Sequence, residues 1–214
     1  MKVLGLDTST LISGIAIVDD GRVLAEVRHD GSARTADLLV AIDRACKNAG
    51  VAPIELDAVA VGAGPGSFTN LRIGMATAKG IAFATGKPLW AVSSLAALAW
   101  DQPGFVVAVL DARRGEVYVG CYLDGVLVGE ERVMPPTEVP PWAQALAAER
   151  TVTYVGDLLA PAVTTPSGVA VARLALSGTR VDVLVSGGPT YIRPSEAEVM
   201  YPDGVPGALR KRDP

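Results

Sequence analysis

The 214-residue sequence has few of the side chains that build metal or redox sites. It contains two cysteines, Cys46 and Cys121, and one histidine, His29. The cysteines lie far apart among apolar neighbours, a pattern typical of reduced core thiols rather than of a disulfide or a metal pair. His29 ends a strand pattern, with no second histidine or cysteine at ligand spacing. The sequence therefore predicts no metal site and no catalytic histidine.

Long apolar runs and an excess of basic residues are also missing. No apolar stretch reaches about 18 residues without a charge or a turn, and the N-terminus enters a strand pattern rather than a signal-like segment. We therefore expect a cytoplasmic protein without a membrane span. Lys and Arg number 19 against 23 Asp and Glu, a net charge of −4. An acidic chain is a poor main surface for RNA or DNA, so a partner is expected to carry any nucleic-acid contact.

What the sequence does contain is an internal repeat. Residues 3–27 predict three strands, with a hairpin turn at Asp20 and Gly21 between the second and the third. Shifted by 104 residues, the same pattern returns without gaps, and Asp124 and Gly125 take the place of that turn. Asp7 at the end of the first strand matches Asp111 in the second copy. The repeat predicts a duplicated architecture.

The elements between and after the two copies complete the pattern. Apolar spacing predicts a helix over 32–49, a strand over 57–62, a helix capped by Ser67 that ends before Gly86, a strand over 89–93 and a short Ala-rich helix. In the second half, three strands precede a helix over 137–148, a strand over 151–155 and increasingly irregular sequence. Two βββαβα units specify the duplicated α/β fold shared by actin, sugar kinases and heat-shock ATPases, with a reduced second lobe. We expect lobes at 1–101 and 102–193 and a mobile tail at 194–214.

A glycine-rich turn at residues 62–66 precedes the second predicted helix. It is no Walker loop, because Ser67 and Phe68 follow its last glycine instead of lysine and then Ser or Thr. The glycines lie two apart, so it is not a dinucleotide fingerprint, and position 69 is Thr, so it is not a nucleophile elbow. Glycines here are predicted to permit close packing.

Small polar residues follow the first strand. Asp7, Thr8, Ser9 and Thr10 have the groups to contact a phosphate or hydrated Mg²⁺. They equally suit a turn that satisfies its own backbone, and this second interpretation is favoured. The corresponding turn of the second copy carries Arg113 and Arg114 and is predicted to be solvated charge or a partner contact. No paired carboxylates indicate acid–base catalysis.

Two rows of small residues run along the helix after the glycine turn. Gly74 and Ala78 form one row, and Ala76 and Gly80 form the other, each four residues apart. Such rows let another element approach closely. Packing on the protein's own sheet is the favoured interpretation, and an intersubunit helix pair is the alternative.

Four segments resemble one family closely. LGLDTST, GAGPGSFTNLRIGMATAKGIA, LDARRGEVYVG and PTYIR are similar to the TsaB (YeaZ) family, over residues 1–193 of this chain. One departure is Asn70, where the family usually has Gly. The resemblance implies a non-catalytic accessory subunit of bacterial threonylcarbamoyladenosine synthesis on tRNA. Its TsaD paralogue would hold the metal and transfer the threonylcarbamoyl group, and a TsaE ATPase would join the complex.

The resemblance also implies partners and an interface. In the family, the first two helices form the surface for self-pairing and for TsaD, so we expect a homodimer when the chain is alone, and tRNA contact mainly through the complex. No cofactor is expected on this chain, since ATP and metal would belong to the complex, and residues 32–38 lack the histidine pair of the catalytic paralogue. The interface residues implied are Arg34, Asp37, Leu38, Ala41, Phe68, Leu71, Arg72 and Met75.

Two other functions remain open from the residues. A stand-alone ATP-dependent kinase or transferase would use Asp7 to Thr10 within the duplicated fold. A peptidase-like protein is a minor alternative, for which the sequence offers neither a nucleophile paired with histidine nor a metal-ligand set.

Overall fold

The first lobe is built on a five-stranded sheet. The computed structural model describes residues 1–30, 36–193 and 200. The strands are ordered β3-β2-β1-β4-β5. β1 pairs antiparallel with β2 and parallel with β4, which pairs parallel with β5. The central strands β1 and β4 are covered on both faces, which explains their almost continuous apolar sequence. The bounds are β1 Lys2–Asp7, β2 Ile12–Asp19, β3 Arg22–Asp30, β4 Ala58–Gly62 and β5 Leu89–Val92.

The second sheet repeats the first and confirms the predicted duplication. Its order is β8-β7-β6-β9, which matches β3-β2-β1-β4, and within the described part of the chain it has no counterpart of β5. β7 and β8 begin and end 104 residues after β2 and β3. The fold is therefore the duplicated actin-like α/β fold with a reduced second lobe. The bounds are β6 Phe105–Arg113, β7 Glu116–Leu123, β8 Val126–Met134 and β9 Val152–Gly156.

Both predicted Asp-Gly hairpin turns are present. The φ angles are 46° at Asp20 and 82° at Gly21, and 49° at Asp124 and 81° at Gly125. Positive φ at both central positions matches the twist of the flanking strands and is tolerated best by Asp, Asn and Gly. The same local chemistry thus produces the same turn in each lobe.

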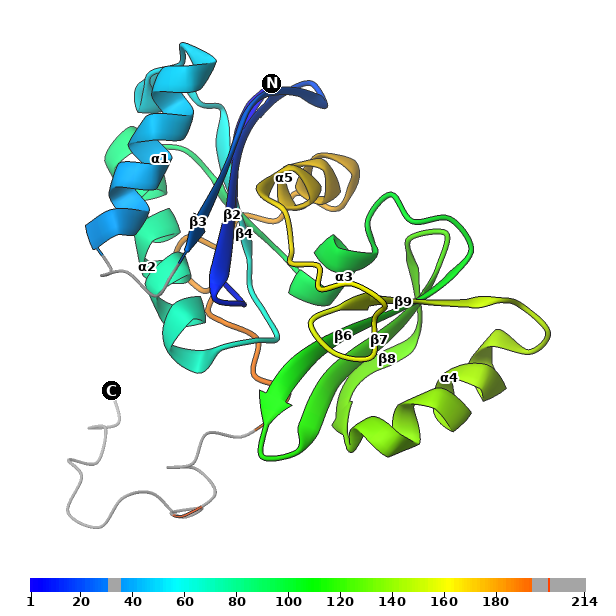
Figure 1. The fold of residues 1–214 in the computed structure, drawn as a ribbon. Helices are drawn as coiled ribbons and strands as arrows, with labels where there is room; N and C mark the ends of the chain where they lie inside the picture. Colours follow the sequence, from blue (N-terminus) through cyan, green and yellow to red (C-terminus); the bar gives the residue numbers. More distant parts are fainter. Residues whose placement is uncertain (31–35, 194–199, 201–214) are drawn as a thin grey trace.

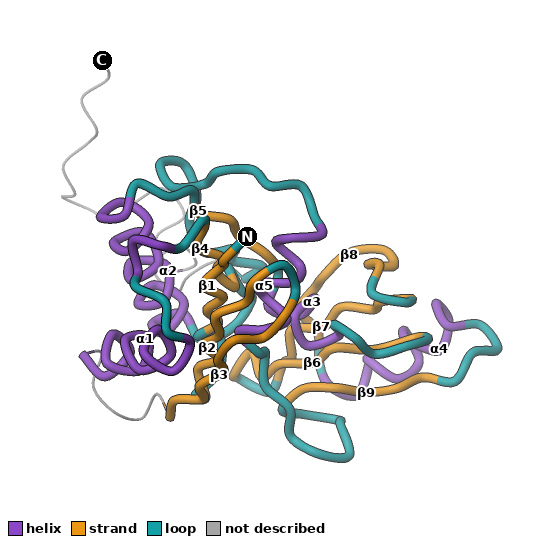
Figure 2. Tube along the Cα trace, turned by 90° about the horizontal axis from the view of Figure 1, so that it is seen from above, coloured by secondary structure: helices purple, strands orange, loops and turns teal. Residues whose placement is uncertain are grey.

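Helices cover both faces of both sheets (Figure 1). α1 and α2 lie on one face of the first sheet, and α5 lies on the other. α4 and α3 cover opposite faces of the second sheet. α3 contacts α5 as well as β6 and lies between the two sheets (Figure 2). The helices are α1 Ala36–Ala49, α2 Phe68–Thr85, α3 Ser94–Ala99, α4 Val139–Ala147 and α5 Gly168–Ser177, with 3₁₀ turns at Pro53–Glu55 and Pro136–Glu138.

The ends of α2 follow the sequence prediction, with one difference. The helix ends at Gly86, whose φ of 66° lets its amide reach the carbonyls of Ala82 and Phe83. Ser67 precedes the helix as predicted, but its side chain makes no capping hydrogen bond. Its backbone amide instead donates to the Ser9 carbonyl at 2.8 Å, which ties the helix start to the β1–β2 turn.

Helix α5 is absent from the sequence prediction and changes the division into lobes. It lies within the predicted second lobe at 102–193, yet its side chains pack on the first sheet. Glycines permit this contact: a Cβ at Gly14 would lie 2.5 Å from the Pro166 carbonyl oxygen, and Gly5 faces the backbone of Gly168. The chain therefore returns to the first lobe after β9. The predicted tail at 194–214 lies outside the described residues, apart from Met200.

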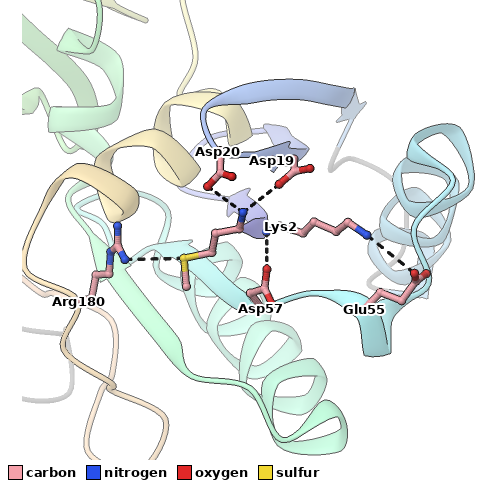
Figure 3. A network of polar contacts seen from close by, with 7 residues as sticks. Lys2, Asp19, Asp20, Glu55, Asp57 and Arg180 are labelled. Atoms are coloured by element: carbon pink, nitrogen blue, oxygen red, sulfur yellow. Dashed lines mark hydrogen bonds and ion pairs between the residues drawn. The ribbon is translucent and has the colours of Figure 1, made fainter.

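The start of β1 is held by polar contacts to neighbouring turns (Figure 3). The amino group of Met1 lies 3.0 Å from an Asp19 carboxylate oxygen and 2.8 Å from one of Asp20. The Lys2 amide donates to Asp57 at 2.7 Å, at the entrance to β4. These contacts connect β1 with the hairpin turn and with the neighbouring parallel strand. No helix among the described residues is long and apolar enough to cross a membrane.

The close packing of α5 generates a stability prediction. A Cβ at Gly168 would lie 2.5 Å from the Ala16 amide nitrogen, whereas a Cβ at Gly80 meets nothing within 4 Å. We expect Gly168→Ala to lower the free energy of unfolding by about 1–3 kcal/mol through overpacking. The control Gly80→Ala should raise it by up to about 1 kcal/mol, because Ala is the better helix former. Urea denaturation measures both, and equal stability of the two variants would contradict this account of α5.

Candidate functional site

Asp7, the first of the four residues considered as a possible phosphate-binding turn, is buried at the end of β1. One carboxylate oxygen accepts hydrogen bonds from the Ser9 amide at 2.8 Å and the Ser9 hydroxyl at 2.6 Å. The other accepts from the Ser94 hydroxyl at 2.7 Å, and Ser94 is the first residue of α3. Burial raises the pKa of Asp7 above its ordinary value, while the hydrogen bonds from Ser9 and Ser94 act in the opposite direction. The carboxylate thus joins β1 to α3.

The neighbouring hydroxyls also have partners within the chain. Thr8 Oγ1 donates to the Asn70 carbonyl at 2.8 Å, and Thr10 Oγ1 donates to the Ile12 carbonyl at 2.8 Å. Asn70, the residue that departs from the family pattern, donates through its side-chain amide to the Thr10 carbonyl at 3.1 Å. The β1–β2 turn is therefore fastened to the first turn of α2. Such bonds are what Asp, Ser and Thr commonly make in turns.

The glycine turn is filled by these same residues. A Cβ on Gly62 would collide with the Asp7 carboxylate, and one on Gly66 would lie 2.5 Å from Ser9 Cβ. A Cβ on Gly74, in α2, would collide with the Thr8 side chain. The glycines bring the turn, the helix and the β1 end into direct contact. This agrees with the packing role predicted for them.

The matching turn of the second lobe has different chemistry. Asp111 accepts from the Arg113 amide at 2.7 Å and forms an ion pair with its guanidinium at 2.9 Å. The Asp111 amide donates to Asp157, which sequence analysis did not single out. Burial raises the pKa of Asp157, and the nearby Asp111 carboxylate acts in the same direction. Among the residues that the structure describes, no three His, Cys, Asp or Glu side chains gather as a metal site.

A cavity of about 390 Å³ lies elsewhere between the lobes. Charged side chains from three places line it: Glu26 and Arg28 on β3, Asp101 after α3, and Arg173 on α5. Arg28 donates to Thr165, and Arg173 donates twice to the Gly21 carbonyl. None of residues 7–10 lines this cavity. It is thus separate from the four candidate phosphate-binding residues.

Four of the eight predicted interface residues, Leu38, Ala41, Leu71 and Met75, are at most 4% exposed, so they lie in the interior of the chain rather than on its surface. Leu38, Ala41 and Met75 belong to the core between the helices and the first sheet. Their apolar side chains follow the stripe that faces the sheet, which the sequence alone did not distinguish from the outer face. Asp37 is partly exposed, and Arg34 lies outside the described residues.

Phe68 and Arg72 do lie on the outer face of α2. The Arg72 guanidinium carbon is 3.8 Å from the Phe68 ring centroid. Arg72 Nε donates to the Tyr191 hydroxyl at 3.0 Å, and the Tyr191 ring lies 5.1 Å from that of Phe68. Tyr191 was not predicted for this surface, although it belongs to the quoted PTYIR segment.

The two small-residue rows of α2 face opposite directions. Gly74 and Ala78 are buried against the protein itself, as favoured from the sequence. Ala76 and Gly80 are exposed, and the next turn carries Phe83, which is 80% exposed. Phe83 and the exposed Leu39 and Val40 of α1 are not among the residues predicted for this surface. We call the exposed residues Phe68, Arg72, Ala76, Gly80 and Phe83 the α2 face.

Comparison with known proteins places this geometry in a family. The family model described as TsaD, tRNA N6-adenosine threonylcarbamoyltransferase, matches residues 32–195. The Bacillus subtilis tRNA threonylcarbamoyladenosine biosynthesis protein TsaB is 34% identical over 73% of this chain and 71% of its own length. The chain belongs to the TsaB (YeaZ) family.

A solved structure and a longer relative extend the comparison. A Pseudomonas aeruginosa structure, described as similar to peptidase YeaZ, superposes with a TM-score of 0.72 at 30% identity, covering 90% of this chain and 99% of that one. A Mycobacterium leprae protein is 36% identical over 95% of this chain. This chain spans only 58% of that relative's length.

The geometry of Asp7 generates a second prediction. Asp7→Ala removes the acceptor of three buried donors and should lower the free energy of unfolding at pH 7 by about 3 kcal/mol. Asp7→Asn keeps an acceptor for Ser9 and should be milder. Because the folded pKa of Asp7 is raised, its ionisation makes wild-type stability fall as pH rises above about 4. Asn does not ionise, so the stability of Asp7→Asn relative to wild type should rise between pH 4 and 7. Denaturant titrations across this pH range test both expectations. A free energy of unfolding of Asp7→Ala equal to that of wild type would contradict the first.

Proposed function

We propose that this chain is a non-catalytic scaffold subunit that supports a TsaD-type transferase in threonylcarbamoyladenosine synthesis on tRNA. The names of the Bacillus subtilis and Escherichia coli relatives support involvement in this biosynthesis. The observation that carries the non-catalytic role is the filled turn at the end of β1. A phosphotransfer site of this fold would direct the Asp7 carboxylate and the Ser9 hydroxyl at its ligand. Here the Ser9 hydroxyl donates to the Asp7 carboxylate, which also accepts from the Ser94 hydroxyl.

Contacts between the lobes support the same role. Ser93 and Tyr122 both donate their hydroxyls to one oxygen of Glu131, which connects the start of α3 with the second sheet. Arg193 donates to the Ala112 carbonyl at 2.9 Å and pairs with Glu116. Actin-like and kinase enzymes work by closing lobes around a ligand. Here side-chain contacts already join the lobes at two places, which suits a rigid scaffold.

The α2 face is the surface we assign to the TsaD-type partner. It combines a flat row at Ala76 and Gly80 with a large exposed side chain, Phe83, one turn away. A partner helix can approach such a row closely. Aromatic residues and Arg are typical anchors of protein interfaces. In the absence of TsaD, the same face would pair with a second copy.

The remaining partners follow from the complex. A TsaE-like ATPase would join it, and ATP and metal would be held by the complex rather than by this chain. The net charge of −4 favours tRNA contact mainly through the partner. Synthesis on tRNA fits a cytoplasmic location.

A stand-alone ATP-dependent kinase or transferase is the second candidate, favoured by the duplicated fold itself. It requires the residues from Asp7 to Thr10 to turn toward a ligand. A peptidase-like activity gains no side chain from this site. The hydroxyls of Ser9 and Ser94, the serines of this site, both donate to Asp7. The single histidine of the sequence, His29, lies away from them on β3, opposite Ser13 of β2.

A drop-out reconstitution tests the proposed function. Threonylcarbamoyl transfer to unmodified tRNA would be measured with the TsaD-type and TsaE-type proteins of the same organism, with and without this chain. We expect product only when the chain is present, and none from the chain alone. Equal product without it would refute the scaffold role.

The assignment of the α2 face predicts the effect of a single charge. Phe83→Asp should weaken binding to the TsaD-type partner at least about tenfold, because it places an unpaired carboxylate in an apolar contact. Its melting temperature should stay close to that of wild type, since Phe83 is 80% exposed.

Two control variants accompany it. Val126→Asp changes an exposed apolar residue of β8, 69% exposed, and should bind normally. Met75→Asp places a charge in the core and should unfold the protein. Wild-type affinity for Phe83→Asp would remove α2 as the docking surface.

A further inference from the structure

The segment after α5 runs along the first lobe and ends on the second. We call residues 182–193 the strap. The Val183 amide donates to the Leu89 carbonyl at 2.8 Å, and Asp182 accepts from the Leu89 amide at 3.1 Å, so the strap begins at the outer edge of β5. The Thr190 amide then donates to the Ala63 carbonyl at 2.7 Å, at the glycine turn. In Figure 1 this segment is the orange trace that passes from the first lobe to the tip of β6.

The last residues of the strap contact three different elements in succession. Thr190 bonds the glycine turn, Tyr191 packs on Phe68 and Arg72 of the α2 face, and Arg193 bonds the β6–β7 turn. An extended chain advances only about 3.3–3.6 Å per residue. Tyr191 and Arg193 are two positions apart, so there is little slack between the second lobe and the Tyr191 ring that packs on Phe68 and Arg72.

The contact of Arg193 with the second lobe is specific. Its guanidinium donates to the Ala112 carbonyl and pairs with Glu116, and both charged side chains are at most 33% exposed. The turn between these acceptors is unusual, because Arg113 and Arg114 have φ of 64° and 57°, in the left-handed region that favours glycine. Such conformations persist only where surrounding contacts hold them. Arg193 contacts the residue before this turn and the residue after it.

We propose that the second lobe sets the affinity of the α2 face for its partner through the strap, with Tyr191 as part of the docking surface and Arg193 as its positioning residue. This inference rests on the proposed function. The partner is the TsaD-type paralogue assigned above, and the continuity of Tyr191 with Phe68 and Arg72 extends that one surface. Tyr191 contacts Phe68 and Arg72 of the α2 face, and Arg193 ties the same segment to the second lobe, so the strap is a route of influence between them.

The test is a double-mutant cycle on the full chain, with the affinity for the TsaD-type partner measured by titration calorimetry. Arg193→Ala should weaken binding about 5- to 150-fold, the usual range for coupling between sites. Tyr191→Ala should weaken it by a similar factor. The double variant should lose little more than either single variant, because both changes release the same ring. If the losses of affinity in the two single variants multiply in the double variant, the inference is overturned.

A matched control removes an arginine of the second lobe that does not touch the strap. Arg132 lies over the Trp142 ring and pairs with Glu130 on β8. Arg132→Ala should leave partner affinity within about twofold of wild type, as expected for independent sites. The charge exchange Arg193→Glu with Glu116→Arg should restore part of the affinity lost in Arg193→Ala, because it re-forms the ion pair between the strap and the second lobe.

Hydrogen exchange on the free chain gives a second readout. Arg193→Ala should increase exchange of the amides of residues 68–72 and 190–191, and Arg132→Ala should not. Unchanged affinity and exchange in Arg193→Ala, alongside weak binding by Phe83→Asp, would overturn this inference and leave the proposed function standing. Normal binding by Phe83→Asp would instead remove the docking surface, and the inference with it.

Discussion

The buried carboxylate of Asp7 is the interaction on which the rest of the first lobe depends. It ends the central strand β1 and accepts hydrogen bonds from Ser9 and from Ser94 at the start of α3. A buried carboxylate is costly unless it is hydrogen-bonded, so the surrounding backbone must approach it closely. The glycines at 62, 66 and 74 allow that approach. The position of α2, and hence of its outer face, follows from this packing.

The same constraint relates the two lobes. Ser94 follows Ser93, whose hydroxyl donates to Glu131 of the second sheet, so the Asp7 network and the contact between the lobes meet at the start of α3. At the other side, the strap joins the glycine turn to the β6–β7 turn. In other proteins, the two lobes of this fold close around a nucleotide. In this chain, side-chain contacts already hold the two lobes together. We regard this bracing as the physical basis of the proposed scaffold role.

Local chemistry made much of the fold predictable. The structure has the Asp-Gly turns and the end of α2 at Gly86, which depend on residues close in sequence. It also has the 104-residue repeat, because the same local pattern occurs in each copy. Helix α5 was missed because its docking depends on Gly5 and Gly14, which precede it by more than 150 residues. The helices α1 and α2 were predicted, but the family resemblance, which supplied the interface residues, did not indicate which side of each helix faces the sheet, and Leu71 and Met75 are buried. The contacts of Tyr191 and Arg193 join residues about 75 to 125 positions apart, and no local pattern in the sequence indicates them.

The most direct test of the central claim is titration of the isolated chain with Mg-ATP in a calorimeter. If Asp7 and its neighbouring hydroxyls serve the packing of β1, α2 and α3, no saturable heat is expected for wild type or for Asp7→Asn. Saturable binding at micromolar ATP that disappears in Asp7→Asn, while that variant remains folded, would contradict the account. The β1–β2 turn would then be a phosphate site, and the stand-alone kinase or transferase would become the better description.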